Sequence, residues 1–461
     1  MTMGEVNNVA NPATTTRPPT RRTAFAEGVD LARAAANTEP GRLRIIGAVL
    51  ALLVVAFGAV TAWQTADRAA AADDVLHKSQ PLSSAAADIY RSLADANTAA
   101  SSGFLAGGEE TPESRKRYEE DIDTAAAKLV TAANNAEPGS PSTASITKLN
   151  KLLPEYMGLV ERARANNRQG YPVGGGYLQY ANEKMQGEML PAAEELYKTE
   201  NRRLQADYGD ATPYPWAAIA LGVLALASLA WAQARNYRRT NRVLNHGLVA
   251  ATAASTVVLL WLVVGHTVAR AGLEDSYEHG VRSLNVLHDA RIASLKARGN
   301  ENLTLVARGA DTVKVTTDGK EVTLDKYDHE FATEMTLLGK GLAQAAKLAD
   351  DQSGEKPVAS AESNMAEWEK RHTTARAQDD NGNYEQALAL VIGGKDATGA
   401  CFDNVDQNLA DALAHEQTEF KQAAGNGLDA MAGLSIGAAV LAVLGAAGAV
   451  LGIGRRLSEY R

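Results

Sequence analysis

Four long runs without a charged side chain constrain this chain of 461 residues more than any other feature. They cover residues 45–66, 211–234, 243–269 and 430–454. Each run holds roughly 20 mostly apolar residues, which is enough for a helix to cross the ~30 Å hydrocarbon core of a bilayer. The mean hydropathy of −0.22 conceals these runs, because the stretches between them are strongly polar. The sequence therefore predicts an all-α membrane protein with four transmembrane helices.

Charge is distributed unevenly between the segments that the runs separate. Residues 64–213 carry a net charge of −6 and residues 269–426 a net charge of −10, whereas the remainder of the chain carries +7. The arginines beside the spans are Arg42, Arg44, Arg235, Arg238, Arg239, Arg242, Arg455 and Arg456. Because basic residues near a span favour the cytoplasmic side, we predict a plasma-membrane protein with cytoplasmic termini and two extracytoplasmic acidic domains.

These boundaries predict nine segments. The tail (1–44), the connector (235–242) and the C-terminus (455–461) are cytoplasmic; the spans cover 45–66, 214–234, 243–269 and 428–454; the outer domains cover 67–213 and 270–427. The order of span, acidic domain and span occurs twice, which indicates duplication of a two-span unit. A cleaved signal peptide is the alternative for the first span, but its n-region of 44 residues would be too long.

Apolar residues recur with helical spacing in both outer domains. Leu82, Ala86, Ile89 and Leu93 step by fours and threes, and the series from Leu273 to Leu295 does the same. Such spacing places one apolar stripe on a long helix, so we predict a helical bundle in each domain. Turn-forming residues divide each domain into four helices, with breaks at 107–112, 137–142 and 169–176, and at 309–325, 351–357 and 379–383.

Two junctions and one insertion stand out within this plan. No proline or turn cluster follows Trp63, so the first span is expected to continue into the first bundle. Pro213 and Pro215 predict a kink before the second span. Residues 312–324 alternate β-branched and polar side chains around Asp-Gly, which predicts a small β-hairpin inserted in the second bundle.

The sequence contains no catalytic motif. Cys401 is the only cysteine, which excludes intramolecular disulfides, cysteine-based zinc sites and iron–sulfur clusters. Phosphate-binding loops, zinc-protease motifs and nucleophile elbows are absent, and the spacing of His279 and His288 does not suit a metal pair. The longest cytoplasmic piece has 44 residues, whereas a domain needs at least ~50. We expect no enzyme activity, no cofactor and no metal, and an output that passes through another protein.

Thr23 is a candidate phosphoacceptor in the N-terminal tail, because it follows Arg21 and Arg22. The simpler interpretation is a solvated basic tail attracted to the membrane surface. The composition gives no sign of nucleic-acid binding. Gly433 and Gly437 in the fourth span have a spacing that permits close helix packing, so a homo-oligomer stays an option.

The layout resembles the GlnX family of actinobacterial membrane proteins. The resemblance covers the whole chain as architecture, and its most characteristic stretch is residues 174–197, GGGYLQYANEKMQGEMLPAAEELY. It implies two partners: an extracytoplasmic solute-binding lipoprotein of the GlnH type, which senses amino acids, and a cytoplasmic Ser/Thr kinase of the PknG type. It transfers no ligand-binding or partner-contact residue to this chain.

Two other functions compete with a signal relay. A cell-envelope scaffold could share the same architecture without responding to a ligand. An accessory subunit of an amino-acid transporter is the third option, although transport by the chain itself is disfavoured because no charged residue lies inside the spans.

Overall fold

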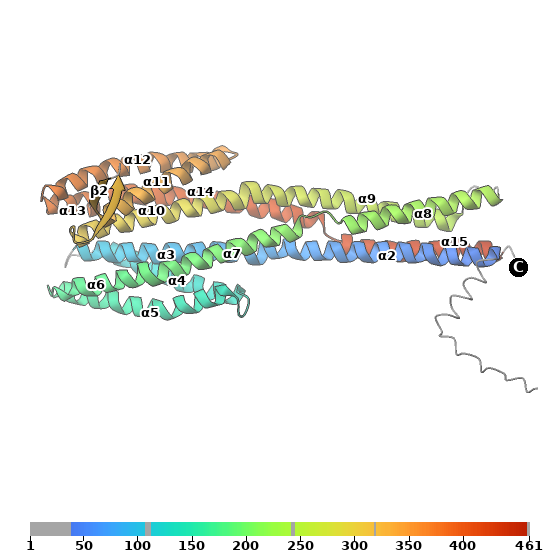
Figure 1. Cartoon of the computed structure of the whole chain (residues 1–461), viewed down its shortest axis with the longest axis horizontal. Coiled ribbons are helices and arrows are strands. Elements are labelled where there is room, and N and C mark those ends of the chain that lie inside the picture. Colours follow the sequence, from blue (N-terminus) through green and yellow to red (C-terminus); the bar gives the residue numbers. More distant parts are fainter. Residues whose placement is uncertain (1–37, 107–111, 241–244, 318–319, 459–461) are drawn as a thin grey trace, which may run out of the picture. The chain divides into compact units, whose positions relative to one another are not determined.

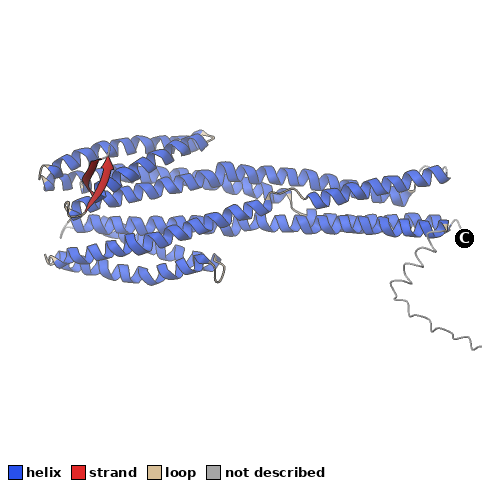
Figure 2. Ribbon diagram, viewed as in Figure 1, coloured by secondary structure: helices blue, strands red, loops and turns tan. Residues whose placement is uncertain are grey.

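The structure is a computed structural model that describes residues 38–106, 112–240, 245–317 and 320–458. Helices account for nearly all of these residues, with one small pair of strands (Figure 2). The chain divides into two compact units. Unit 1 comprises Met1–Thr61, Ala217–Leu260 and Ile436–Arg461, and unit 2 comprises Ala62–Trp216 and Trp261–Ser435.

Unit 1 is built from apolar helices. It contains the first part of α2 (Glu39–Asp74), most of α8 (Trp216–Thr240), the first part of α9 (His246–Asp275) and most of α15 (Leu434–Ser458). The helical stretches that contain them are long and apolar enough to cross a membrane. Small residues let the backbones approach closely here, because a Cβ on Gly247 would overlap the backbone of Gly448 and Gly452. The described residues thus confirm four candidate spans.

The first bundle in unit 2 consists of four helices. These are α3 (Gln80–Leu105), α4 (Pro112–Asn135), α5 (Pro141–Arg168), and the pair α6 (Val173–Lys184) and α7 (Leu190–Ala211) joined by the π-helical η3 (Met185–Met189). The ends of α4, α5 and α6 agree with the breaks that the sequence predicts at 137–142 and 169–176. Ser140 caps α5 by accepting a hydrogen bond from the Thr143 N–H.

The second bundle repeats this order with additions. It comprises α10 (Arg282–Ala307), strands β1 (Thr312–Thr317) and β2 (Lys320–Asp325), α11 (Lys326–Leu348), α12 (Gln352–Asp380), α13 (Tyr384–Ile392) and α14 (Thr398–Ala430). The strands are antiparallel and pair Thr312 with Asp325. Two details of the sequence prediction were wrong. The α12 helix begins before Pro357, because Asp351 caps it, and a turn at Gly393 separates α13 from α14.

The two halves of the chain correspond element by element. The α3 and α10 helices each contain 26 residues, and α8 and α15 each contain 25. A π-helical segment precedes each long bundle helix: η1 (Val75–Ser79) lies between α2 and α3, and η4 (Ser276–Val281) lies between α9 and α10. These shared features support duplication of a two-span unit.

The junctions at the other end of each half are interrupted. The α7 helix ends at Ala211 and α8 begins at Trp216, so Pro213 and Pro215 lie in a helix break rather than at a kink within one helix. Gly433 follows α14 and adopts a φ of 72°, which terminates that helix before α15. In contrast, α2, η1 and α3 follow one another without a non-helical residue, as do α9, η4 and α10.

The core of unit 2 lies where the two bundles meet. Figure 1 shows α3 and α10 side by side, and each helix is buried on most of its circumference. The sequence predicted a single apolar stripe on each of them, which was too narrow. Their additional buried positions are small or polar, including Ser92, Asn97 and Asn302, so hydropathy periodicity does not reveal them.

Candidate functional site

The interface between the two bundles is the candidate functional site, because it contains polar side chains that both halves contribute. The Asn302 side chain is fully buried and donates a hydrogen bond to Ser102 Oγ at 3.0 Å. Asn302 belongs to α10 and Ser102 to α3, so the bond joins the two central helices. A buried polar contact of this kind favours one register of the two helices over its neighbours.

Further hydrogen bonds lie beside the π-helical segments. Tyr208 on α7 and Ser276 in η4 place their hydroxyl oxygens 2.7 Å apart. Gln80, the first residue after η1, donates to the side chain of Gln417 on α14 at 2.9 Å. The last helix of each half therefore contacts the other half close to its π-helical segment. A change in the packing of the bundles would reach both segments directly.

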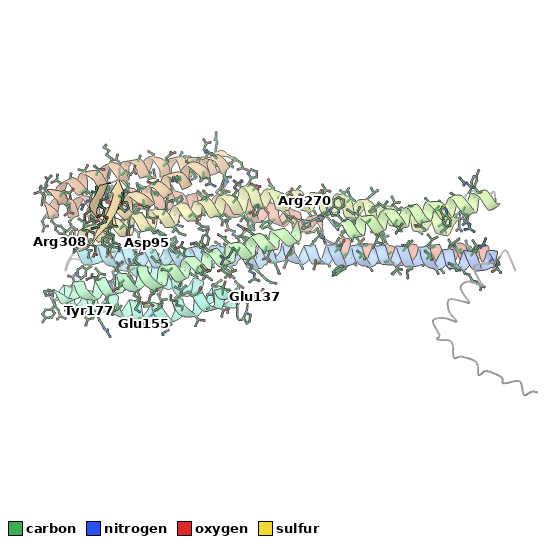
Figure 3. The ribbon with its side chains drawn as sticks, in the orientation of Figure 1. Asp95, Glu137, Glu155, Tyr177, Arg270 and Arg308 are labelled. Carbon is green, nitrogen blue, oxygen red and sulfur yellow. The ribbon has the colours of Figure 1, made fainter. Side chains whose placement is uncertain are left out.

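Arg117 on α4 joins three helices through its guanidinium group. It donates to both carboxylate oxygens of Asp95 on α3, at 3.0 and 3.3 Å, and to Asp403 on α14 at 2.6 Å. Burial by itself would lower the pKa of Arg117, but the two carboxylates raise it above its usual value. Figure 3 marks Asp95 on α3, within unit 2. The Arg117–Asp403 pair is an ion pair between the two bundles.

A buried carboxylate organises the interior of the second bundle. Glu301 on α10 is 1% exposed, accepts from His372 Nδ1 at 3.0 Å and from Trp368 Nε1 at 3.2 Å, and pairs with Arg298 at 2.5 Å. His372 also contacts Asp328 through Nε2 at 3.0 Å. Burial opposes the charge of Glu301, yet its hydrogen bond to His372 and the nearby Arg298 keep its pKa below the usual value. The network is ionic and well satisfied.

His288 lies on α10 at the same interface. Its ring is 6.1 Å from that of Tyr197 on α7, in an edge-to-face arrangement. Burial lowers the pKa of His288 to about 4, against the opposing influence of Asp88. The side chain is therefore neutral near pH 7, as expected for a histidine on the apolar stripe.

One group of side chains has the donor types of a metal site. Asp351, His415 and Glu419 bring their ligand atoms within 4.8 Å of one another. Asp351 already accepts hydrogen bonds from the N–H groups of Ser353 and Gly354 as the cap of α12. His415 Nε2 lies 3.1 Å from Asp351 and 3.4 Å from Glu419, which is also the geometry of an ion-pair cluster.

The residues that the sequence singled out lie elsewhere. Thr23 and Arg242 lie outside the described residues. The remaining arginines lie on the apolar helices: Arg42 and Arg44 on α2, Arg235, Arg238 and Arg239 on α8, and Arg455 and Arg456 on α15.

The sequence reasoning missed Arg117, Asp403, Glu301 and Arg298. One signal was available, since Asn97 interrupts the first apolar stripe and is buried, donating to Asn182 at 2.9 Å. A polar residue on a buried stripe indicates a partner, but it does not identify which one.

Comparison with known families supports a role in sensing. Residues 71–209, which cover the first bundle, match the family described as an actinobacterial sensor domain. No curated protein and no solved structure matches the chain. The matched region and the four candidate spans indicate a membrane protein of actinobacterial sensor type with a sensing or signalling role.

Proposed function

We propose that this protein is a transmembrane signal relay without catalytic activity of its own. Its two bundles face the outside of the plasma membrane, and both termini and the connector at 235–242 face the cytoplasm. An extracytoplasmic event alters the packing of the two bundles, and the spans transmit that change to a cytoplasmic effector. The sensor-domain match and the four apolar helices support this assignment.

The continuity of two helices carries the proposal. Residues of α2 lead through η1 into α3, and residues of α9 lead through η4 into α10, without an intervening loop. The apolar part of each stretch is a candidate span, and its other part is a central helix of the bundle interface. A shift between α3 and α10 therefore has a direct helical path toward the span on the same chain segment.

The π-helical segments suit such transmission. A π-helical turn has wider hydrogen bonding than an α-helix and is frequent at functional positions. Gly280 in η4 lies against Phe420 of α14, so a Cβ at this position would approach the Phe420 Cβ to 2.9 Å. Close packing of this kind favours discrete arrangements over continuous deformation.

The partners follow from the architectural resemblance. We propose an extracytoplasmic solute-binding lipoprotein of the GlnH type as the source of the signal, reporting amino-acid availability. We propose a Ser/Thr kinase of the PknG type as the cytoplasmic effector. The basic side chains near the span ends, such as Arg44 and Arg235, support the sidedness of these contacts.

Copurification tests this function. The full chain would be crosslinked gently in native membranes, solubilised in detergent and purified, with an unrelated four-span protein as control. We expect a solute-binding protein and a Ser/Thr kinase to accompany this chain and to be absent from the control. Recovery of neither partner would contradict the proposed relay.

A further inference from the structure

A cavity of about 410 Å³ lies between the two bundles, beside the Arg117–Asp403 ion pair. Residues of α3 and α4 line one side, and Arg298, the turn at Gly393–Gly394 and the start of α14 line the other. Its volume is within the range of ~300–1,000 Å³ that is typical of small-molecule sites. The cavity thus differs from a packed bundle core, and both halves of the chain contribute to it.

Cationic groups predominate in the lining. Arg117, Arg298 and Lys395 face two acidic residues, Asp95 and Asp403. Arg298 is 5% exposed and lies so close to Gly399 that a Cβ there would come within 2.8 Å of its guanidinium nitrogen. Only glycine leaves room for this guanidinium group at the cavity wall.

The N-terminus of α14 adds to the positive potential. This helix has 33 residues, and Ala397 at its N-cap provides no side-chain hydrogen bond to the first turn. Gly399 and Ala400 of that turn line the cavity. Uncapped N–H groups and the helix dipole together favour an anion at such a position.

Thr98 on α3 provides an independent indication of a ligand. Its side chain is 6% exposed and lines the cavity, and its hydroxyl has no hydrogen-bond partner among the residues that the structure describes. A buried hydroxyl without a partner costs roughly 1–3 kcal/mol. An occupant with an acceptor oxygen would satisfy it.

We propose that this cavity binds a small carboxylate anion, held by Arg117, Arg298, the Thr98 hydroxyl and the first turn of α14. Asp95 and Asp403 in the same lining disfavour a doubly charged phosphate, whereas a carboxylate group matches the planar guanidinium groups. The bound carboxylate competes with Asp403 for Arg117. Since that ion pair joins the two bundles, occupancy alters their contact, and this step deepens and rests on the proposed sensing role.

Calorimetric titration of the full, detergent-solubilised chain tests the site. The probes are succinate, L-aspartate as the analogue of succinate with one ammonium group, and inorganic phosphate. We expect both carboxylates to bind, since Asp95 or Asp403 can pair with the ammonium group of L-aspartate, and phosphate to bind more weakly. Absence of carboxylate binding at millimolar concentration, or binding of phosphate alone, would overturn the proposal.

Substitutions locate the binding. Thr98→Val keeps the shape of the side chain and should weaken succinate binding roughly two- to tenfold, and Arg117→Gln should weaken it roughly tenfold or more. Asp403→Asn removes the competing carboxylate and should strengthen binding, a result that a purely structural ion pair would not produce. Arg115→Gln, on the same helix but outside the cavity lining, is the matched control and should leave binding unchanged.

Unchanged affinity in both Thr98→Val and Asp403→Asn would overturn the site, since neither change is expected to unfold the protein. Thermal unfolding of each variant checks that it is folded. The titration needs no partner protein, so its failure is distinguishable from failure of the relay. Carboxylate binding without a copurifying effector would retain the site and reject the relay.

Discussion

Replacing Glu301 by glutamine removes one negative charge from the interior of the second bundle while keeping the shape of the side chain. In the native protein, this carboxylate receives the indole N–H of Trp368, the ring of His372 and the guanidinium of Arg298. All three donors converge on one acceptor-only group, and Glu301 itself is 1% exposed.

The expected cost follows from these contacts. The amide that replaces the carboxylate offers one acceptor oxygen, and its NH₂ group must face at least one of the three donors. Arg298, which is 5% exposed, loses its charged partner and keeps only its hydrogen bonds to Thr398 and the Val391 carbonyl. Removing one member of a buried ion pair typically costs about 3–5 kcal/mol, so we expect Glu301→Gln to lower the free energy of unfolding by about 3 kcal/mol.

Thermal unfolding of the full chain in detergent measures this loss, with Glu321→Gln as the control. Glu321 pairs with Lys314 on the hairpin, but both side chains are about 70% exposed, so the control should lose less than about 1 kcal/mol. The reasoning would be refuted if the melting temperature of Glu301→Gln equalled that of Glu321→Gln.

Three other predictions concern pH, packing and sidedness. The His288 pKa of about 4 lies below its ordinary 6.5, so the unfolded chain binds the proton first and stability should fall from pH 6.5 to 4, by at most about 3 kcal/mol; His288→Leu should lose this component of the pH dependence of the melting temperature. Gly272 would place a Cβ 3.1 Å from the Gly427 backbone, so Gly272→Ala should lower the melting temperature, whereas Gly425→Ala, with open space around it, should preserve or raise it by up to about 1 kcal/mol of helix propensity. In intact cells of a Cys401→Ser strain, an impermeant maleimide should label Glu355→Cys and leave Tyr237→Cys unlabelled; the opposite pattern would reverse the proposed topology.

Helix boundaries were predictable where glycine, proline and capping residues mark them. Ser140 before Pro141 and the turn at Gly170 delimit α5 as expected. The turn at Gly393–Gly394 carried a similar signal, but the short apolar stretch before it suggested one continuous helix. The continuation of α2 into α3 also followed from the sequence, because nothing between Trp63 and Leu82 interrupts a helix except Pro81, which the first turn of α3 accommodates.

The candidate site was much less predictable. Arg117 and Asp403 are 286 positions apart, and both belong to helices rich in other charged residues. Periodicity identifies the buried face of one helix, but it contains no information about which helix of the other bundle packs there. The charge of Glu301 likewise resembled that of a solvated residue, because its partners Trp368 and His372 come from α12, far along the chain.

Transmission from the bundle interface to the spans is the central claim, and a distance measurement within unit 1 tests it most directly. Nitroxide labels at Leu52→Cys and Val223→Cys, two exposed positions of unit 1 in a Cys401→Ser background, report the arrangement of the apolar helices in lipid nanodiscs. Arg117→Gln in unit 2 breaks the ion pair between the bundles, and Arg115→Gln is the control on the same helix. The relay predicts that the electron–electron distance distribution changes in Arg117→Gln and not in Arg115→Gln. Identical distributions in all three proteins would contradict it.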